Sequence, residues 1–317
     1  MKIKNTIKKV LAVLFIAVLS ANCKKVKENF DDCGVILRFT YFKNTDNIDK
    51  FPSEVHKITI FVFDQAGNFV AKYEETGPFG ATYSKRLNNL PAGNYTFVVW
   101  GDLSDNTPFT EDIGVGRNKQ EGGLKLKTTG VNKVATPPEP LFYGKIENVI
   151  VKNTLNQVVT IDMMKNTKSV TAIFDGLPVS PGKEGEFVCT IVAANGEYTF
   201  DNVPPQRAGL LTYLPQTKFN VAQQQMTADF VTMRLFENNE CQSRIILTFV
   251  PSDGSPPVVI MDISLTDAIK AEYNRAIDFV KEDKFVLHFK VDWVSFGNFS
   301  VEINGWIVVR EQTLVVG

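Results

Sequence analysis

The side chains best suited to catalysis or metal binding are scarce in this chain and far apart. Its only histidines are His56 and His288, and it has no HExxH or CxxC pattern that would predict a zinc site. It also has no GxSxG elbow, so a serine hydrolase would have no visible nucleophile. A carboxylate pair of the glycosidase kind is assembled only by the fold, and the sequence leaves that chemistry open. We therefore predict that the protein is not an enzyme and has no cofactor and no metal.

One cysteine near the N-terminus is at a position where covalent modification of the protein is predicted. Four lysines and no acid precede the apolar run Val10–Leu19, which ends in Ser20-Ala21-Asn22-Cys23. This pattern is typical of a secretory signal, and the run is shorter than the about 20 residues that a membrane-spanning helix needs. A cysteine at this point resembles the acylation site of a bacterial lipobox, although Ser20 and Asn22 depart from the usual residues. We expect residues 1–22 to be a lipoprotein signal peptide and Cys23 to be lipidated; a secreted protein with a stray cysteine is the alternative.

The composition suits a protein with real hydrophobic cores and no affinity for nucleic acid. Processing before Cys23 would leave 295 residues, a length that suits two domains. The formal charge of −1 becomes −5 without the four signal lysines, so no basic excess could attract nucleic acid. The other cysteines are Cys33, Cys189 and Cys241, an odd number that implies no disulfide framework. Cys189 could pair with Cys241, but we expect two buried free thiols.

Short alternating strands separated by glycine and proline clusters account for most of the chain. In residues 35–42, Val35, Leu37, Phe39 and Tyr41 share one face, a period of two that predicts a half-buried strand. Hairpins are predicted over 58–75 and over 186–202, the second around Asn195-Gly196. Further strands are predicted over 95–103, 140–151, 157–164, 169–177, 232–238, 243–251, 256–265, 284–294 and 299–309. This spacing predicts an all-β protein built of β-sandwiches or open barrels.

Two other segments break the strand pattern. Residues 265–283 carry an apolar stripe at helical spacing behind a possible cap formed by Ser264 and Asp267, and we expect a helix that covers a sheet. Residues 104–139 are rich in glycine and proline and are predicted to be a long loop. The expected organisation is a lipidated tether over 23–32, an N-terminal domain over 33–165 and a C-terminal domain over 166–317.

The strand phrases, taken in order, resemble the Bacteroidetes-type fimbrial anchor-subunit lipoprotein family of the fimbrillin superfamily. The phrases are CGVILRFTYFKNTD (33–46), FPSEVHKITIFVFDQAGNFV (51–70), LPAGNYTFVVWGDL (90–103), PLFYGKI (140–146), AANGEYTFDN (193–202), LTYLP (211–215) and VEINGWIVV (301–309). The resemblance implies two tandem transthyretin-like β-sandwich domains. The helix predicted over 265–283 would cover the second of them. The resemblance also implies a lipid-anchored protein of the outer membrane that holds a fimbria base. Its partner would be a fimbrial stalk subunit, engaged by strand exchange.

The C-terminus offers a strand for such an exchange. The tail IVVREQTLVVG (307–317) ends in apolar residues, which is unusual because termini are normally polar. Our hypothesis is a donor strand that contains Trp306, Val308, Leu314 and Val316; a strand docked in its own domain is the alternative. A surface glycan-binding lipoprotein and a tip adhesin of the same superfamily are the competing functions. Against glycan binding, the three tryptophans lie in strand patterns typical of a core rather than of an exposed platform: Trp100, Trp293 and Trp306.

Overall fold

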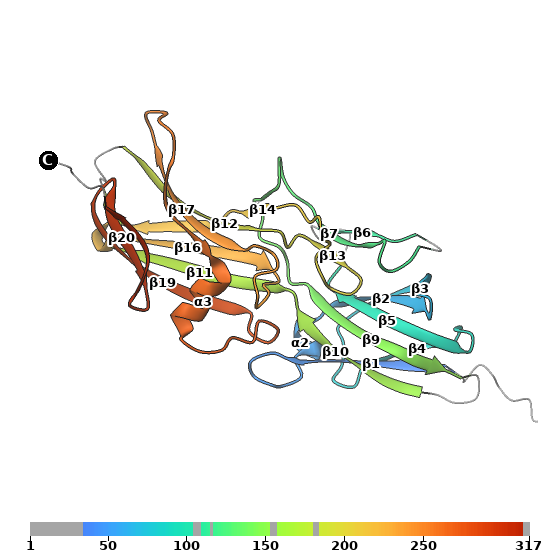
Figure 1. The fold of residues 1–317 in the computed structure, drawn as a ribbon. Coiled ribbons are helices and arrows are strands. Elements are labelled where there is room, and N and C mark those ends of the chain that lie inside the picture. The colour runs from blue at the N-terminus through green and yellow to red at the C-terminus, as the bar shows by residue number, and fades with distance from the viewer. Residues whose placement is uncertain (1–33, 104–108, 115–116, 153–156, 180–183, 313–317) are drawn as a thin grey trace, which may run out of the picture.

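A computed structural model gives the fold of this chain as an elongated, almost entirely β-stranded molecule (Figure 1). The structure describes residues 34–103, 109–114, 117–152, 157–179 and 184–312. The predicted signal peptide, Cys23, the tether and Cys33 lie outside these residues. So do Leu314 and Val316 of the predicted donor strand.

The N-terminal half contains a seven-stranded sheet that folds over on itself. The order is β3-β2-β5-β9-β10-β1-β4, but β9 and β10 pair only at Met164↔Tyr143 and Lys165↔Phe142. The sheet therefore divides there into two layers, with one hydrophobic core formed by side chains from both. The strands are β1 (Val35–Lys43), β2 (Lys57–Asp64), β3 (Phe69–Thr76), β4 (Ser84–Leu87), β5 (Gly93–Gly101), β9 (Phe142–Val151) and β10 (Gln157–Lys165). The short helix α2 (Phe51–Glu54) follows β1.

The paired strands β2 and β5 lie between two hydrophobic cores and contribute side chains to both. In β2, Ile58, Ile60 and Val62 face the core shared with β1, whereas Phe61 and Phe63 face the other way and pack on a second core. A strand buried on both faces has a continuous apolar sequence, and this explains why residues 58–63 do not alternate. The predicted hairpin over 58–75 is confirmed as β2–β3.

Two sheets of the C-terminal half lie over a common core. The six-stranded sheet has the order β15-β16-β11-β19-β20-β21, and the five-stranded sheet has the order β18-β17-β12-β14-β8. Buried side chains from β11, β12, β17 and β19 fill the space between them, among them Phe174, Ile191, Leu247 and Phe289. The strands are β11 (Thr167–Asp175), β12 (Gly185–Ala193), β14 (Leu211–Tyr213), β15 (Gln216–Asn220), β16 (Gln225–Met233), β17 (Arg244–Pro251), β18 (Val258–Ser264), β19 (Lys284–Ser295), β20 (Asn298–Ile303) and β21 (Trp306–Gln312). A 3₁₀ turn, η2 (Val221–Gln223), links β15 and β16. Together with the folded first half, this arrangement is sandwich-like, as predicted.

Residues 104–139 are not simply a loop, because they contain three short strands: β6 (Phe109–Asp112), β7 (Gly123–Leu126) and β8 (Lys133–Val134). Strand β7 pairs with β13 (Glu197–Thr199), and β8 pairs with β14, so this segment supplies strands to sheets of the C-terminal half. The predicted hairpin over 186–202 is therefore wrong: β13 pairs with β7 rather than with β12. Asn195 is instead buried, and its amide donates to the carbonyl oxygens of Met233 and Arg234.

The predicted domain boundary falls where β10 ends and β11 begins. Asn166 alone separates the two strands, and it is fully buried. Its side-chain amide exchanges two hydrogen bonds with that of Asn202, at 2.6 and 3.1 Å. The halves are also joined by apolar contact, since the Phe200 ring packs on Phe61 and Phe63 at centroid distances of 4.9 and 5.1 Å. The division into domains over 33–165 and 166–317 stays a prediction.

Helix α3 (Leu265–Tyr273) is shorter than predicted. Its start is as expected, because the Ser264 hydroxyl accepts a hydrogen bond from the Asp267 N–H and caps the helix. It ends at Asn274, whose φ of 47° is left-handed and stops the helical hydrogen bonding. Ala268 and Ile269 are buried in the core of the C-terminal half, so the predicted covering role is confirmed.

The cysteine prediction is confirmed and the tryptophan prediction holds only in part. Cys189 and Cys241 are free and buried. Trp100 is in the core, and Trp293 packs on aromatic neighbours, with its ring stacked 5.2 Å from that of Phe299. Trp306 is 67% exposed, which contradicts its predicted place in the core, because it lies on an edge strand.

Candidate attachment edge

The C-terminal edge strand is the candidate functional site. Strand β21 pairs antiparallel with β20, and in the described part of the chain it has no pairing strand on its other side. The turn between them is Asn304-Gly305, with φ of 47° and 78°, the signature of a tight hairpin turn. The Asn304 amide donates to the carbonyl oxygens of Ala271 and Glu272 at 3.0 and 3.1 Å. These bonds tie the hairpin to the end of α3.

Some apolar side chains of β21 pack against the core, and others lie in solvent. Val308 and Val309 are half-buried against the core, whereas Trp306 and Ile307 are 67% and 45% exposed. The pairing shifts register between Val301 and Glu302, so Val308 lies in a bulge. A strand edge presents unpaired backbone N–H and C=O groups that another chain can pair with, and exposed apolar side chains add contact area to such pairing.

The structure settles the position of half of the predicted donor residues. Trp306 and Val308 lie on β21, docked in their own sheet, which is the arrangement of the alternative hypothesis at these two positions. The predicted single strand over 299–309 is wrong, because the turn at Asn304-Gly305 divides it into β20 and the first part of β21. The sequence also did not reveal that β21 is at an edge, because sheet order depends on distant pairings.

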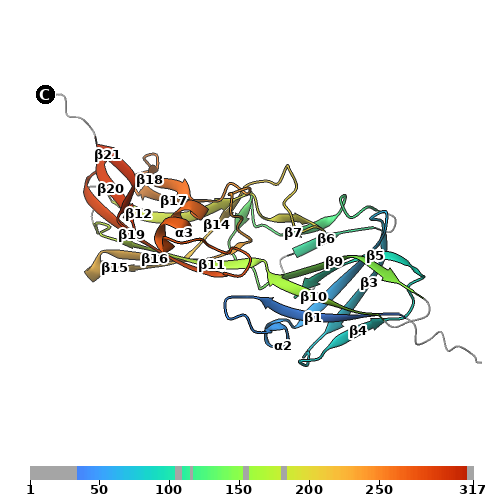
Figure 2. The same ribbon diagram turned by 60° about the horizontal axis from the view of Figure 1, so that its bottom comes forward.

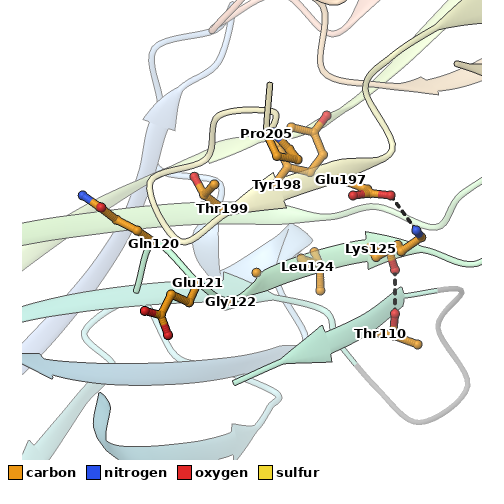
Figure 3. Close-up of a pocket in the computed structure, with 11 residues that line it drawn as sticks. Thr110, Gln120, Glu121, Gly122, Leu124, Lys125, Glu197, Tyr198, Thr199 and Pro205 are labelled. Atoms are coloured by element: carbon orange, nitrogen blue, oxygen red, sulfur yellow. Dashed lines mark hydrogen bonds and ion pairs between the residues drawn. The ribbon is translucent and has the colours of Figure 1, made fainter. Parts of the chain in front are cut away.

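A pocket of about 290 Å³ lies elsewhere, on the small sheet β13-β7-β6 (Figure 3). Figure 3 shows Lys125 of β7 joined to Glu197 of β13, with 2.6 Å between ammonium and carboxylate. The Thr110 hydroxyl donates to the Lys125 carbonyl oxygen at 3.3 Å. The ion pair described in this pocket therefore joins β7 to β13. We interpret it as a contact that stabilises the small sheet.

A second, polar depression of about 450 Å³ is lined by the turn after β2 and by residues of β9 and the loop before β7. Lys119 and Lys145 both contact the carboxylates of Glu147 and Asp201, at 2.9 to 3.2 Å. The hydrogen bond from Lys145 is the largest cause of the lowered pKa of Glu147. Burial would raise the pKa of Asp201, but the two lysines lower it overall. This network links β9 of the N-terminal half to the loop after β13, so it too is explained by structure.

The predicted surface position of His288 is confirmed. Its imidazole is exposed and lies 3.0 Å from the Glu272 carboxylate. Within the described residues, no three His, Cys, Asp or Glu side chains converge as a metal ion would require. The described helices include none that is long and apolar enough to cross a bilayer.

The described residues form an almost entirely β-stranded molecule with layered sheets and with β21 at the edge of one of them. Comparison with known protein families identifies the class of protein. Residues 30–312 match the family model described as "Mfa2: Fimbrillin-A associated anchor proteins Mfa1 and Mfa2". The chain belongs to this family of fimbrial anchor proteins, and the predicted resemblance is confirmed. The family is of a fimbrial structural type.

Solved structures share the fold over nearly their whole length. The fimbrial anchor protein Mfa2 from Porphyromonas gingivalis superposes with a TM-score of 0.70 at 21% identity, covering 87% of this chain and 99% of that one. A Bacteroides thetaiotaomicron protein described as a candidate polysaccharide-binding protein gives 0.68 at 24% identity, covering 89% and 99%. An adhesin candidate from the same organism gives 0.67 at 24%, covering 88% and 99%. No curated protein matches the sequence.

Proposed function

We propose that this chain anchors a fimbria in the bacterial outer membrane through lipid on Cys23. We also propose that it engages the adjoining stalk subunit through its C-terminal strand, with no catalytic step. Its family consists of fimbrial anchor proteins, and the chain starts with a lipobox-like signal. A diacylated and N-acylated cysteine would hold firmly, because each buried methylene contributes about 0.8 kcal/mol. The two proposed domains, over 33–165 and 166–317, would then place the lipid and the partner strand in different domains.

The observation that supports the partner edge most directly is the position of β21. Strand β21 lies at one end of the elongated molecule, and the start of β1 lies at the other (Figure 2). A subunit bound at β21 would therefore be as far from the lipid as the molecule allows. Since β21 pairs with β20 alone among the described strands, its release into a neighbour's sheet would replace one set of backbone hydrogen bonds by another. Trp306, Val308, Leu314 and Val316 remain the proposed donor residues.

The experiment compares three variants in fimbriated cells. Cys23→Ala should release fimbriae into the medium with the anchor still attached. Deletion of residues 313–317 should also release fimbriae, but the anchor should stay in the membrane fraction. Trp306→Ala should weaken retention in the same way as the deletion, whereas Val294→Ala, which changes a 68% exposed side chain at the end of β19, should not.

The location of the anchor separates the two parts of the proposal. Normal retention of fimbriae by the Cys23→Ala cells would contradict lipid anchoring. Normal retention after the deletion and in the Trp306→Ala cells would contradict the C-terminal strand as the partner site.

A further inference from the structure

The strands that connect the two ends of the described chain all run in one direction. Strand β1 is parallel to β10, with partners from Val35↔Gln157 to Thr40↔Asp162. Strand β10 leads through the single residue Asn166 into β11. Figure 2 shows the two strands following one another from one half into the other. Strand β11 is parallel to β19 from Ser169↔Lys284 onward. Strand β21 runs the same way as β19, because each is antiparallel to β20.

This arrangement decides how a pulling force acts. A force applied before β1 and after β21 is directed along the strands, so β1 must slide past β10 before the N-terminal half can open. Sliding strains the evenly spaced hydrogen bonds of a parallel pair together, whereas peeling breaks them one after another. Resistance to forced unfolding is governed by the unfolding barrier, which is higher when many bonds must break in one step.

One carboxylate fastens β1 to β10 where the pairing becomes irregular. The register shifts between Thr40 and Lys43, which would leave the end of β1 poorly paired. There the Asp162 carboxylate accepts hydrogen bonds from the Thr40 hydroxyl at 3.1 Å and from the Phe42 N–H at 2.9 Å. The Lys43 ammonium donates to the Asp162 carbonyl oxygen at 2.9 Å. Three groups of β1 are therefore held by a single residue of β10.

We propose that the parallel β1–β10 pair, fastened at Asp162, is a clamp that resists tension between the two ends of this protein. The source of that tension rests on the proposed anchoring function. The clamp itself is a property of the purified chain, so it can fail or hold independently of whether the protein retains fimbriae on cells.

The first test compares two pulling directions on the full-length chain held in a single-molecule force instrument. In one, the handles are at the two termini. In the other, the C-terminal handle is moved to Gln157→Cys, an exposed position at the start of β10 that pairs with Val35, with Cys23 and Cys33 changed to serine in both cases. The second direction pulls the paired ends of β1 and β10 apart, so their hydrogen bonds break one after another. We expect the N-terminal half to extend at high force in the first direction and at clearly lower force in the second.

The second test changes the fastening residue. Asp162→Ala should raise the unfolding rate of the N-terminal half at fixed force by at least about tenfold, because it removes hydrogen bonds to a charged acceptor. Asp229→Ala is the matched control: its carboxylate accepts from the Thr171 hydroxyl at 2.6 Å between antiparallel strands, and β16 is not in the line of force. With handles at the termini, it should leave the unfolding rate of the N-terminal half unchanged.

Two results would overturn the clamp. One is an extension of the N-terminal half that occurs at the same force in both pulling directions. The other is an equal effect of Asp162→Ala and Asp229→Ala on the rate of that extension. If Asp162→Ala does not fold, the pulling directions on the unsubstituted chain still decide, together with Thr40→Val, which removes only the hydroxyl bond to Asp162.

Discussion

The first and last described strands both carry large apolar side chains but have opposite surroundings. Strand β1 has a neighbour on each side, β10 and β4, and Val35 and Leu37 are completely buried. Strand β21 has β20 alone among the described strands, and Trp306 and Ile307 lie largely in solvent. Both segments are apolar and β-branched, so strand propensity does not distinguish them. The two strands differ in their positions within their sheets. We therefore expect β1, the interior strand, to contribute to stability, and β21, the edge strand, to contact a partner.

The largest expected effect is a difference in the free energy of unfolding between a variant in the interior strand β1 and a variant in the edge strand β21. Leu37→Ala should lower the free energy of unfolding by about 2–5 kcal/mol, because it leaves a cavity in the core between the two layers. Ile307→Ala should lower it by about 0.5 kcal/mol, as expected for a largely exposed side chain. Urea unfolding followed by circular dichroism measures both. Similar losses for the two variants would contradict the contrast.

The second prediction concerns Lys168, near the start of β11. This strand follows β10, the partner of β1, and belongs to the sheet that ends in β21. The Lys168 side chain is fully buried, and its ammonium donates to the Glu282 carbonyl oxygen at 2.8 Å. Burial lowers the pKa of Lys168 to about 7, below the about 10.4 of an unfolded lysine. Between these values the unfolded chain binds more protons, so the free energy of unfolding should rise with pH, by at most about 1.4 kcal/mol per unit.

The measurement is the urea midpoint at pH 7, 8 and 9. Lys168→Met should remove this rise, whereas Lys218→Met, on the exposed strand β15, should keep it. Curves that stay parallel for the Lys168 variant and the unsubstituted chain would show that Lys168 does not titrate in this window.

The sequence predicted the strands whose own pattern is strong and missed those defined by distant partners. Alternation located β1, and the turn after β2 predicted the hairpin to β3, whereas the predicted strand over 299–309 proved to be the two strands β20 and β21. The strands β7 and β8 are only four and two residues long, and each pairs with a strand more than 70 residues away, β13 and β14, so the local sequence does not predict them. For the same reason Asn195-Gly196 was misinterpreted as a hairpin turn. A common turn dipeptide does not reveal that the following strand joins another sheet.

The sequence predicted that the candidate site contains a strand, but it did not predict that this strand is exposed at a sheet edge. The run 306–309 has apolar side chains on both faces, which is typical of a buried strand. Only the structure shows that β21 has no described strand on its second side and that Trp306 is 67% exposed. The end of α3 was missed on similar grounds. The apolar stripe continues to Val280, but the left-handed backbone at Asn274 stops the helix after Tyr273.

The smallest expected effect tests how β21 is held in place. Asn304→Gly keeps a residue that tolerates a positive φ but removes the two hydrogen bonds to the end of α3. The loss of unfolding free energy should be about 1 kcal/mol, because these bonds lie at the surface. Hydrogen exchange should accelerate more in β20–β21 than in β1–β10.

Asn132→Gly is the matched control. Asn132 also has a positive φ, of 58°, and its side chain makes no hydrogen bond with the described residues. This change should be close to neutral and should leave exchange in β21 unaltered. Equal effects of the two substitutions would mean that the hairpin is positioned by its turn alone, and that β21 is available without any release from α3. Faster exchange confined to the Asn304 variant would instead identify the helix contact as the restraint that a binding subunit has to overcome.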